Sequence, residues 1–272
     1  MTKELDFNKS EQYTLSIRLS TDGFSFSIYN PINGNDFYFR TFPTNNQRSM
    51  AANVKAFLAA TEELNNRYKQ TNILIHSQRY TVVPLDIFEE EYMEDIFYQN
   101  VREKRNEIVM CNILSNSNSV IIFSVDKLTH VFLSEHFPNA RFFSSISPLI
   151  EHFTMKSKLG NSKKFYANIN NGSLDAILLD RGKLMLVNTY QTNSYNDINY
   201  FILNIWQQTG YSQERDELYI SGTEKTKKII NSELEKYIKH TYIINPSSEF
   251  NTSEINKIEE IPFDIQSLIL CE

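Results

Sequence analysis

Glycine is scarce in this chain: only 7 of its 272 residues are glycine, fewer than half of what a typical usage of about 7% would give. Loops that hold phosphate groups through their backbone need several glycines close together. Here the closest pair, Gly172 and Gly182, is ten residues apart. This spacing excludes a Walker A loop, a G-x-G-x-x-G fingerprint and a G-x-S-x-G nucleophile elbow.

Cysteine and long apolar runs are also rare. Cys111 and Cys271 are the only cysteines, and the first eleven residues are polar and charged, unlike the apolar core of a secretory leader. Two distant cysteines without such a leader are typical of reduced thiols in the cytoplasm. No stretch approaches the 18 apolar residues of a transmembrane helix. We therefore expect a cytoplasmic protein without a transmembrane segment.

The residues that are present favour a globular protein. Hydrophobic residues make up 41% of the chain and aromatic residues 13%, which is enough to build a core and argues against disorder. The formal net charge of −6 makes the chain a poor binder of phosphate backbones, so we expect no nucleic-acid partner. None of the five histidines has the H-E-x-x-H spacing, and we expect no metal site.

The first half of the chain has the pattern of short strands followed by helices. Residues 13–19 and 24–28 alternate in polarity as half-buried strands do, and the hairpin signal Asp22-Gly23 lies between them. A second signal, Asn33-Gly34, precedes the aromatic residues 37–39. These features predict a three-stranded meander. Apolar spacing then predicts a helix over residues 47–69, a buried strand over 72–76 and a helix over about 85–100.

The second half repeats this order. Turns at Asn171-Gly172 and Arg181-Gly182 separate three predicted strands, which are followed by a helix ending at Gly210, the strand 218–221, a further helix and the strand 242–244. Three pairs of landmarks are separated by 149, 148 and 145 residues: Gly23 and Gly172, Gly34 and Gly182, and Ile75 and Ile220. The agreement of these offsets indicates an internal duplication.

A different pattern lies between the two copies. Residues 108–114 and 120–125 predict a hairpin, after which Asp126 begins a helix as its N-cap. A short strand at Phe142-Phe143 follows, and then a helix with Ser147 as N-cap and Pro148 as its first residue. We therefore expect a first lobe over 1–159, with an inserted segment at about 104–145, and a second lobe over 160–272.

This duplicated plan resembles the actin-like ATPase superfamily, which includes sugar kinases and heat-shock chaperones. Residues 13–28 resemble the family's first phosphate hairpin, 165–182 its second, and 218–223 its adenosine motif, a strand that ends in glycine before a helix. The chain looks most like the actin-like proteins of bacterial pilus and secretion machines, and like an uncharacterised bacterial domain-of-unknown-function family with this fold. The resemblance implies an α/β fold made of two ribonuclease-H-like lobes.

The family's chemical residues are absent from the matching positions. Each phosphate hairpin of the family carries Asp-x-Gly on its first strand, where the Asp organises Mg²⁺ and the Gly lets the backbone approach a phosphate. That triplet falls on Arg18-Leu19-Ser20 in the first copy and on Asn168-Ile169-Asn170 in the second. Both acids and both glycines are missing, and Mg²⁺ prefers carboxylate ligands.

The sequence therefore predicts a nucleotide site that has decayed. The vestigial cleft candidates are the turn residues Asp22, Gly23, Asn171 and Gly172, together with Gly222 of the adenosine-type motif. We expect no catalytic residue and no cofactor. The leading hypothesis is a non-catalytic binding or scaffold protein with a protein partner.

The alternative hypothesis is a nucleotide-binding protein or a divergent ATPase or kinase-like enzyme that uses ATP and Mg²⁺ in the same cleft. Asp22, Asp175 or Asp180 would then stand in for the missing carboxylate. Strand alternation gives Asp175 the parity of Ile177 and Leu179, whereas Asp180 lies at a turn. The sequence does not choose among the three.

Two further segments have open interpretations. Lys225, Lys227 and Lys228 begin the helix after Gly222, where they either hold an anion or are simply solvated. Residues 264–271 form a short amphipathic segment that docks on the body of the fold or lies on a membrane. The oligomeric state and the identity of a partner stay open.

Overall fold

The computed structural model describes residues 5–32, 37–246 and 261–271, and these form two compact units. The first unit holds the described residues up to Ile113 together with Asn118–Ser147, and the second holds Leu114–Ser117 and the described residues from Pro148 onward. The expected lobe boundary after residue 159 stays a prediction. The turn signal Asn33-Gly34 lies outside the described residues.

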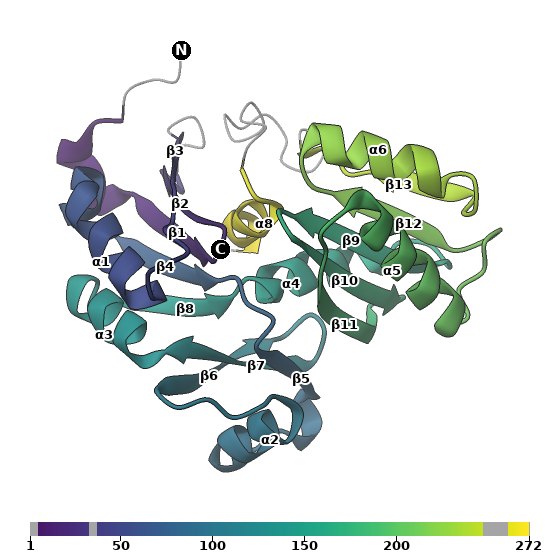
Figure 1. Ribbon diagram of the computed structural model, residues 1–272, viewed down its shortest axis with the longest axis horizontal. Coiled ribbons are helices and arrows are strands. Elements are labelled where there is room, and N and C mark those ends of the chain that lie inside the picture. Colours follow the sequence, from purple (N-terminus) through teal and green to yellow (C-terminus); the bar gives the residue numbers. More distant parts are fainter. Residues whose placement is uncertain (1–4, 33–36, 247–260, 272) are drawn as a thin grey trace. The chain divides into compact units, whose positions relative to one another are not determined.

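Each unit contains a five-stranded sheet, and the two sheets have the same topology (Figure 1). In each, three antiparallel strands form a meander. A fourth strand pairs in parallel with the first strand of the meander, and a fifth pairs in parallel with the fourth. The strand order is β3-β2-β1-β4-β8 in the first unit and β11-β10-β9-β12-β13 in the second. This match confirms the duplicated two-lobed α/β fold.

In the first unit the apolar face of the sheet is covered by helices. The strands are β1 (Thr14–Ser20), β2 (Gly23–Tyr29), β3 (Phe37–Phe42), β4 (Gln70–Ile75) and β8 (Ala140–Ser144). Val54 and Phe57 of α1 (Met50–Ala60) and Leu133 of α3 (Lys127–His136) pack on the alternate residues of β1 and β2 in one core. Asp126 caps α3 by accepting a hydrogen bond from the Thr129 amide, as predicted.

The helix predicted over residues 47–69 is shorter than its apolar pattern. Ser49 caps α1, and Thr61 is extended, so the helix ends at Ala60 and a 3₁₀ turn, η2 (Glu62–Asn65), follows. The Tyr68 hydroxyl donates to the Glu63 carbonyl at 2.6 Å. The apolar residues beyond Thr61 therefore lie in a turn after the helix. The periodicity of apolar residues alone does not distinguish such a turn from a longer helix.

The inserted sheet contains a strand that the sequence pattern did not predict. β5 (Tyr80–Pro84) pairs antiparallel with β7 (Ser119–Asp126). β7 is the central strand, and β6 (Glu107–Leu114) lies on its other side. The helix predicted over 85–100 is also wrong in its first half, which forms the 3₁₀ turns η3 (Leu85–Ile87) and η4 (Glu90–Tyr92) before α2 (Met93–Asn100) begins. The Leu85 amide donates to the Asn118 carbonyl beside the sheet, and Phe88 is extended, so no continuous helix forms there.

In the second unit, helices cover both faces of the sheet. The strands are β9 (Lys163–Asn170), β10 (Ser173–Asp180), β11 (Lys183–Gln191), β12 (Glu217–Ser221) and β13 (His240–Ile243). Apolar residues of α5 (Tyr195–Gln208) and α6 (Glu224–Leu234) form one core with one face of the sheet. On the other face, Phe153 of α4 (Ile146–Ser157) stacks on Tyr166 of β9. Gly210 follows α5 with φ of +66°, as expected of a residue just past a helix end.

Two predictions about the connecting and terminal helices have clear outcomes. α4 begins at Ile146, so Ser147 is not its N-cap; its hydroxyl instead donates to Asn112 of β6 at 2.8 Å. The C-terminal helix α8 (Phe263–Cys271) packs Phe263 against Phe153 of α4, and Ile265 and Leu268 are buried. It therefore docks on the body of the fold.

The helices in the described part of the chain include none that is long and apolar enough to cross a membrane.

Candidate functional site

A row of polar side chains crosses the second sheet at the β9–β10 hairpin, within the segment that resembles the second phosphate hairpin of actin-like ATPases. The strand register places Thr189 of β11, Asp175 of β10, Asn168 of β9 and Ser221 of β12 side by side. All four residues are buried, and each is hydrogen-bonded to the next. We call these four residues the polar row.

Asp175 is the centre of the polar row. Its Oδ1 accepts a hydrogen bond from the Thr189 hydroxyl at 2.8 Å, and its Oδ2 accepts from the Nδ2 atoms of Asn168 at 2.9 Å and Asn170 at 2.8 Å. The side chain of Asn168 is used at both ends, because its Oδ1 accepts from the Ser221 hydroxyl at 2.8 Å. The two asparagines that replace the family's Asp and Gly therefore hold a buried carboxylate.

The local sequence explains why Asp175 is held so firmly. β9 and β10 close a hairpin through the pair Asn170 and Ser173, with Asn171 and Gly172 as the two loop residues. Gly172 has φ of +79°, a left-handed conformation that glycine adopts without strain. Leu174 and Ala176 on either side of Asp175 face the core. The period of two along a strand then directs Asp175 to the opposite face, beside Asn168.

Gly222 lies directly after β12 and approaches β9 closely. A β-carbon at this position would lie 2.9 Å from the carbonyl oxygen of Ile169 and 3.3 Å from its Cβ. The backbone has φ of +142°, which side chains of L-residues rarely adopt. The close contact between Gly222 and Ile169 of β9 is sufficient to explain a glycine at this position, without a bound ligand.

The first hairpin has a different set of residues at the same positions. Arg18 of β1 is buried and lies opposite Ser25 of β2. The pair that closes this hairpin is Ser20 and Gly23, so Gly23 is the first residue of β2 and not a loop residue. The Ser20 hydroxyl donates to the carboxylate of the exposed Asp22.

Among the three candidate carboxylates, only Asp175 lies in the polar row. Asp22 belongs to the first unit, where it accepts its hydrogen bond from Ser20. Asp180 lies at the far end of β10, opposite Lys163 and Lys183, and pairs with Arg181 at 3.0 Å. Asp180 therefore cannot join a site centred on Asp175. Within the described ranges, no three or more histidine, cysteine, aspartate and glutamate side chains group closely enough to hold a metal ion.

The lysines that begin α6 have different surroundings. Lys227 is buried; its ammonium pairs with Glu224 and donates to the Ile244 carbonyl at 3.0 Å. Lys228 is exposed and lies 3.9 Å from Glu224, and Lys225 is exposed. Lys227 thus connects α6 to the residue after β13. The helix N-terminus itself is capped by Thr223, whose side chain accepts from the Thr226 amide.

Sequence reasoning identified part of the polar row and missed the rest. Asn168 was noted as the residue in place of the family's Asp, Asp175 was noted as a candidate carboxylate, and Ser221 lies within the adenosine-type motif of residues 218–223. Thr189 of β11 gave no signal, because one threonine in an apolar strand is ordinary. A sequence signal would have required the register of β10 with β11, which places Thr189 opposite Asp175.

Comparisons with known proteins agree with this fold. A family model described as "Protein of unknown function (DUF3822)" matches residues 2–241. A crystal structure from Bacteroides thetaiotaomicron, of a protein with actin-like ATPase fold and unknown function, is 45% identical over 99% of this chain and 100% of that chain, with a TM-score of 0.86. The PilM–PilN type IV pilus biogenesis complex is 12% identical over 95% and 98% of the two chains, with a TM-score of 0.58. No protein of curated function matches the chain.

These matches confirm the resemblance to actin-like proteins and to an uncharacterised family with this fold. The match at 12% identity shows a shared fold alone, whereas the family model and the structure at 45% identity extend over most of the chain. The chain therefore belongs to the family described as Protein of unknown function (DUF3822), and it has the actin-like ATPase fold.

Proposed function

We propose that this protein is a non-catalytic binding or scaffold protein that keeps the actin-like fold after its nucleotide site has decayed. The observation that carries this proposal is the state of Asp175, the one carboxylate in the polar row. Its two oxygens accept hydrogen bonds from Thr189, Asn168 and Asn170. The carboxylate therefore acts as the acceptor at the centre of a structural network.

Metal binding at Asp175 would compete with this network. A carboxylate offers about four lone-pair sites, and three of them are already used by these donors. Mg²⁺ demands near-ideal octahedral geometry at about 2.0–2.1 Å and dehydrates reluctantly. To bind it, Asp175 would have to release buried amide and hydroxyl donors, each at a cost of about 1–3 kcal/mol when left without an acceptor.

The glycines of the candidate site also have structural uses. Gly172 allows the left-handed turn of the β9–β10 hairpin, and Gly222 allows the close approach to Ile169. Neither residue needs a phosphate to account for it. These uses support a fold whose geometry is retained without its former chemistry.

We propose that the partner of this chain is another protein. We also propose that the chain acts in the cytoplasm. The similar fold occurs in the PilM–PilN type IV pilus biogenesis complex, which is a precedent for such a partner. The formal charge of −6 disfavours a nucleic-acid partner. We also propose that the decayed nucleotide cleft is represented by five residues whose present roles are structural: Asp22, Gly23, Asn171, Gly172 and Gly222.

Thermal unfolding with Mg-ATP tests the proposal. A ligand at 100 times its Kd adds about 2.7 kcal/mol, which raises the Tm of a domain of this size by roughly 5–10 °C. We expect no shift with Mg-ATP, Mg-ADP or ATP in excess EDTA, and no release of phosphate. An unrelated actin-like ATPase in the same buffers is the positive control.

A shift that requires Mg²⁺ would contradict the proposal and support the alternative, a nucleotide-binding protein that uses different residues. The variant Thr189→Val then locates the effect, because it removes a donor from the Asp175 carboxylate and preserves shape. A nucleotide site at the polar row would respond to this variant. The matched substitution Thr209→Val, after α5 in the same unit, would leave it unchanged.

A further inference from the structure

The strand β13 forms one edge of the second sheet, and among the described strands it pairs only with β12. The two strands are parallel, with Tyr242 opposite Tyr219 and Ile243 opposite Ile220. An edge strand presents a row of backbone N–H and C=O groups to which another strand can pair. The groups that β13 presents therefore indicate what can be added to this edge.

The direction of the backbone groups on β13 follows from one hydrogen bond. The Ile244 amide donates to the Ile220 carbonyl of β12 at 2.8 Å. Because the backbone groups of alternate residues point to the same side of a strand, those of Tyr242 also point toward β12. Those of Thr241 and Ile243 point away from the sheet. In the part of the chain that the structure describes, nothing forms a hydrogen bond with these outward groups.

Other sheet edges in the described chain carry features that hinder such pairing. Pro84 ends β5 and has no N–H to donate. The pairing of β11 with β10 contains a register shift, which interrupts a regular edge. Asn112 covers the edge of β8, where its side chain donates to the Phe142 carbonyl and accepts from the Ser144 amide. Residues 240–244 contain no proline and no Lys, Arg, Asp or Glu, so β13 lacks these protections.

The large side chains at β13 are apolar in character and accessible. Tyr242 is 44% exposed and Ile243 is 36% exposed, and they project from opposite faces because side chains alternate along a strand. Tyr237, in the turn before β13, is 55% exposed. A strand in the middle of a sheet buries such side chains on both faces. The strand β13 therefore has the composition of an inner strand at the position of an edge.

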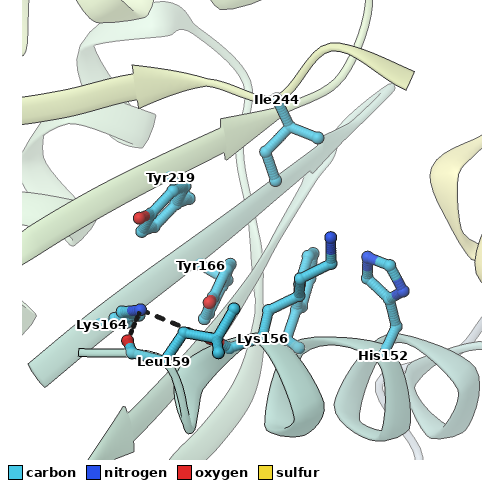
Figure 2. Close-up of a pocket in the computed structure, with 8 residues that line it drawn as sticks. His152, Lys156, Leu159, Lys164, Tyr166, Tyr219 and Ile244 are labelled. Atoms are coloured by element: carbon cyan, nitrogen blue, oxygen red, sulfur yellow. Dashed lines mark hydrogen bonds between the residues drawn. The ribbon is translucent and has the colours of Figure 1, made fainter. Parts of the chain in front are cut away.

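Tyr242 is the last of a row of stacked tyrosines. Tyr219 of β12 is the register partner of both Tyr166 of β9 and Tyr242. The rings stack at centroid distances of 5.0 and 5.1 Å, close to the spacing between neighbouring strands. Figure 2 shows Tyr166 and Tyr219 side by side, where they line a pocket together with Ile244. Of the described rings, only that of Tyr219 contacts Tyr242, so a further strand with an aromatic residue in register would continue the row.

We propose that β13 pairs antiparallel with β13 of a second copy of this chain, about a two-fold axis beside Tyr242. This register places Thr241 of each copy opposite Ile243 of the other, and each such pair exchanges both of its N–H···O=C hydrogen bonds. Tyr242 lies opposite Tyr242 of the second copy in a non-hydrogen-bonded pair, where side chains are closest. The two rings join the tyrosine rows, and the two sheets become one.

A second copy fits this edge because the edge is complementary to itself. The outward groups of Thr241 and Ile243 lie symmetrically about Tyr242, as a two-fold interface requires when one patch forms both sides. Residues 240–244 of one copy run opposite the same residues of the other, and since they include no Lys, Arg, Asp or Glu, no like charges face one another there. This inference goes beyond the proposed function, and Mg-ATP binding would leave it intact.

Sedimentation of the full chain at concentrations up to about 1 mM tests the proposal. The four residues of β13 bury a small area, so we expect a monomer–dimer equilibrium with a Kd between about 1 µM and 1 mM. Thr241→Pro removes one outward N–H, a change that an edge strand tolerates. It should raise the Kd at least about tenfold, with the fold checked by circular dichroism. Thr241→Val keeps the N–H and leaves the Kd unchanged.

A disulfide at the two-fold axis tests the register. Tyr242→Cys places two thiols in a non-hydrogen-bonded pair whose Cα atoms are about 4.5 Å apart, within the range of about 4.4–6.8 Å that disulfides span. Under mild oxidation we expect a covalent dimer, with the bond located between the two positions 242 by mass spectrometry. Tyr200→Cys, at a 63% exposed position on α5, is the matched control. The unchanged chain gives the background from Cys111 and Cys271.

Three outcomes would overturn the inference. A chain that stays monomeric up to about 1 mM and forms no disulfide at position 242 does not pair with itself, and its edge is left to a strand of another protein. A dimer that Thr241→Pro leaves intact uses a different surface. A dimer that Thr241→Pro disrupts, but that Tyr242→Cys does not cross-link, has a different register and contradicts the two-fold axis at Tyr242.

Discussion

The substitution Gly222→Ala separates a structural glycine from one that a ligand requires. The new β-carbon would lie 2.9 Å from the Ile169 carbonyl oxygen, closer than a methyl group and an oxygen can approach without a shift. That oxygen belongs to β9, which is held between β10 and β12. The strand therefore cannot move away without disturbing two sets of backbone hydrogen bonds.

Two costs add in this variant. Inserting a methyl group into a packed region costs about 1–3 kcal/mol. A φ of +142° belongs to a region that is essentially restricted to glycine, at a further cost on the order of 1–3 kcal/mol. We expect Gly222→Ala to lower the free energy of unfolding by roughly 2–6 kcal/mol. Gly210→Ala is the control, because φ is +66° and no atom lies within 4 Å of the added carbon; it should cost about 1–2 kcal/mol.

The chain carries a natural reporter for this comparison. Trp206 is its single tryptophan, is 2% exposed on α5, and stacks on Phe165 of β9. Urea unfolding followed by tryptophan fluorescence therefore reports on the second unit, and the midpoint and slope give the free energy. If Gly222→Ala costs no more than Gly210→Ala, the close approach to Ile169 does not explain Gly222, and our structural account of this residue is refuted.

Three further predictions concern buried polar contacts. Asp175→Ala leaves three donors without their acceptor, and tryptophan fluorescence should show a loss of about 3 kcal/mol; a loss below about 1 kcal/mol would contradict the network. Asn112→Ala removes the hydrogen bond that Asn112 donates to the Phe142 carbonyl and the two that it accepts from the Ser144 amide and the Ser147 hydroxyl. Hydrogen exchange at the Ser144 amide should therefore accelerate at least about tenfold. Unchanged exchange would show that Asn112 does not protect this amide. Burial opposes the charge of Glu107, but hydrogen bonds from Arg79 and Ser124 and the charge of Arg79 hold its pKa below the ordinary value. Since the folded pKa is lowered, this stabilisation is complete above a pH of about 4.5 and is lost as the pH falls through the folded pKa. Arg79→Met should therefore cost about 3 kcal/mol at neutral pH, and its Tm deficit in circular dichroism should shrink in acid; a deficit independent of pH would rule out the ion pair.

Local sequence signals predicted the repeated parts of the fold because their causes are local. Strands with a period of two, closed by turns such as Asn171-Gly172 and Arg181-Gly182, form antiparallel hairpins from neighbouring residues. Helix faces with a period of 3.6 predicted α5 and α6 for the same reason. The duplicated order and the resemblance to actin-like proteins followed from these local elements.

Elements that depend on distant partners were mispredicted or missed. The strand β5 forms by pairing with β7, which is more than thirty residues away in the sequence. The polarity of its own residues alternates too weakly to predict a strand. The helix predicted from residue 85 is interrupted, because Phe88 and Glu89 are extended between the 3₁₀ turns η3 and η4. Ser147 had the sequence signature of a helix cap, yet its hydroxyl bonds to Asn112 of a different strand.

The sequence by itself determined the two copies of the fold and the absence of the family's acids and glycines from both hairpins. Only the tertiary structure decided what took their place. Residues 168, 175, 189 and 221 form one polar row, and residues 166, 219 and 242 form one stacked row of tyrosines, because register aligns strands that are far apart in the chain. A hydrogen bond or a ring contact requires two partners at short distance, and sequence spacing fixes that distance only within a turn, a helix or a single strand.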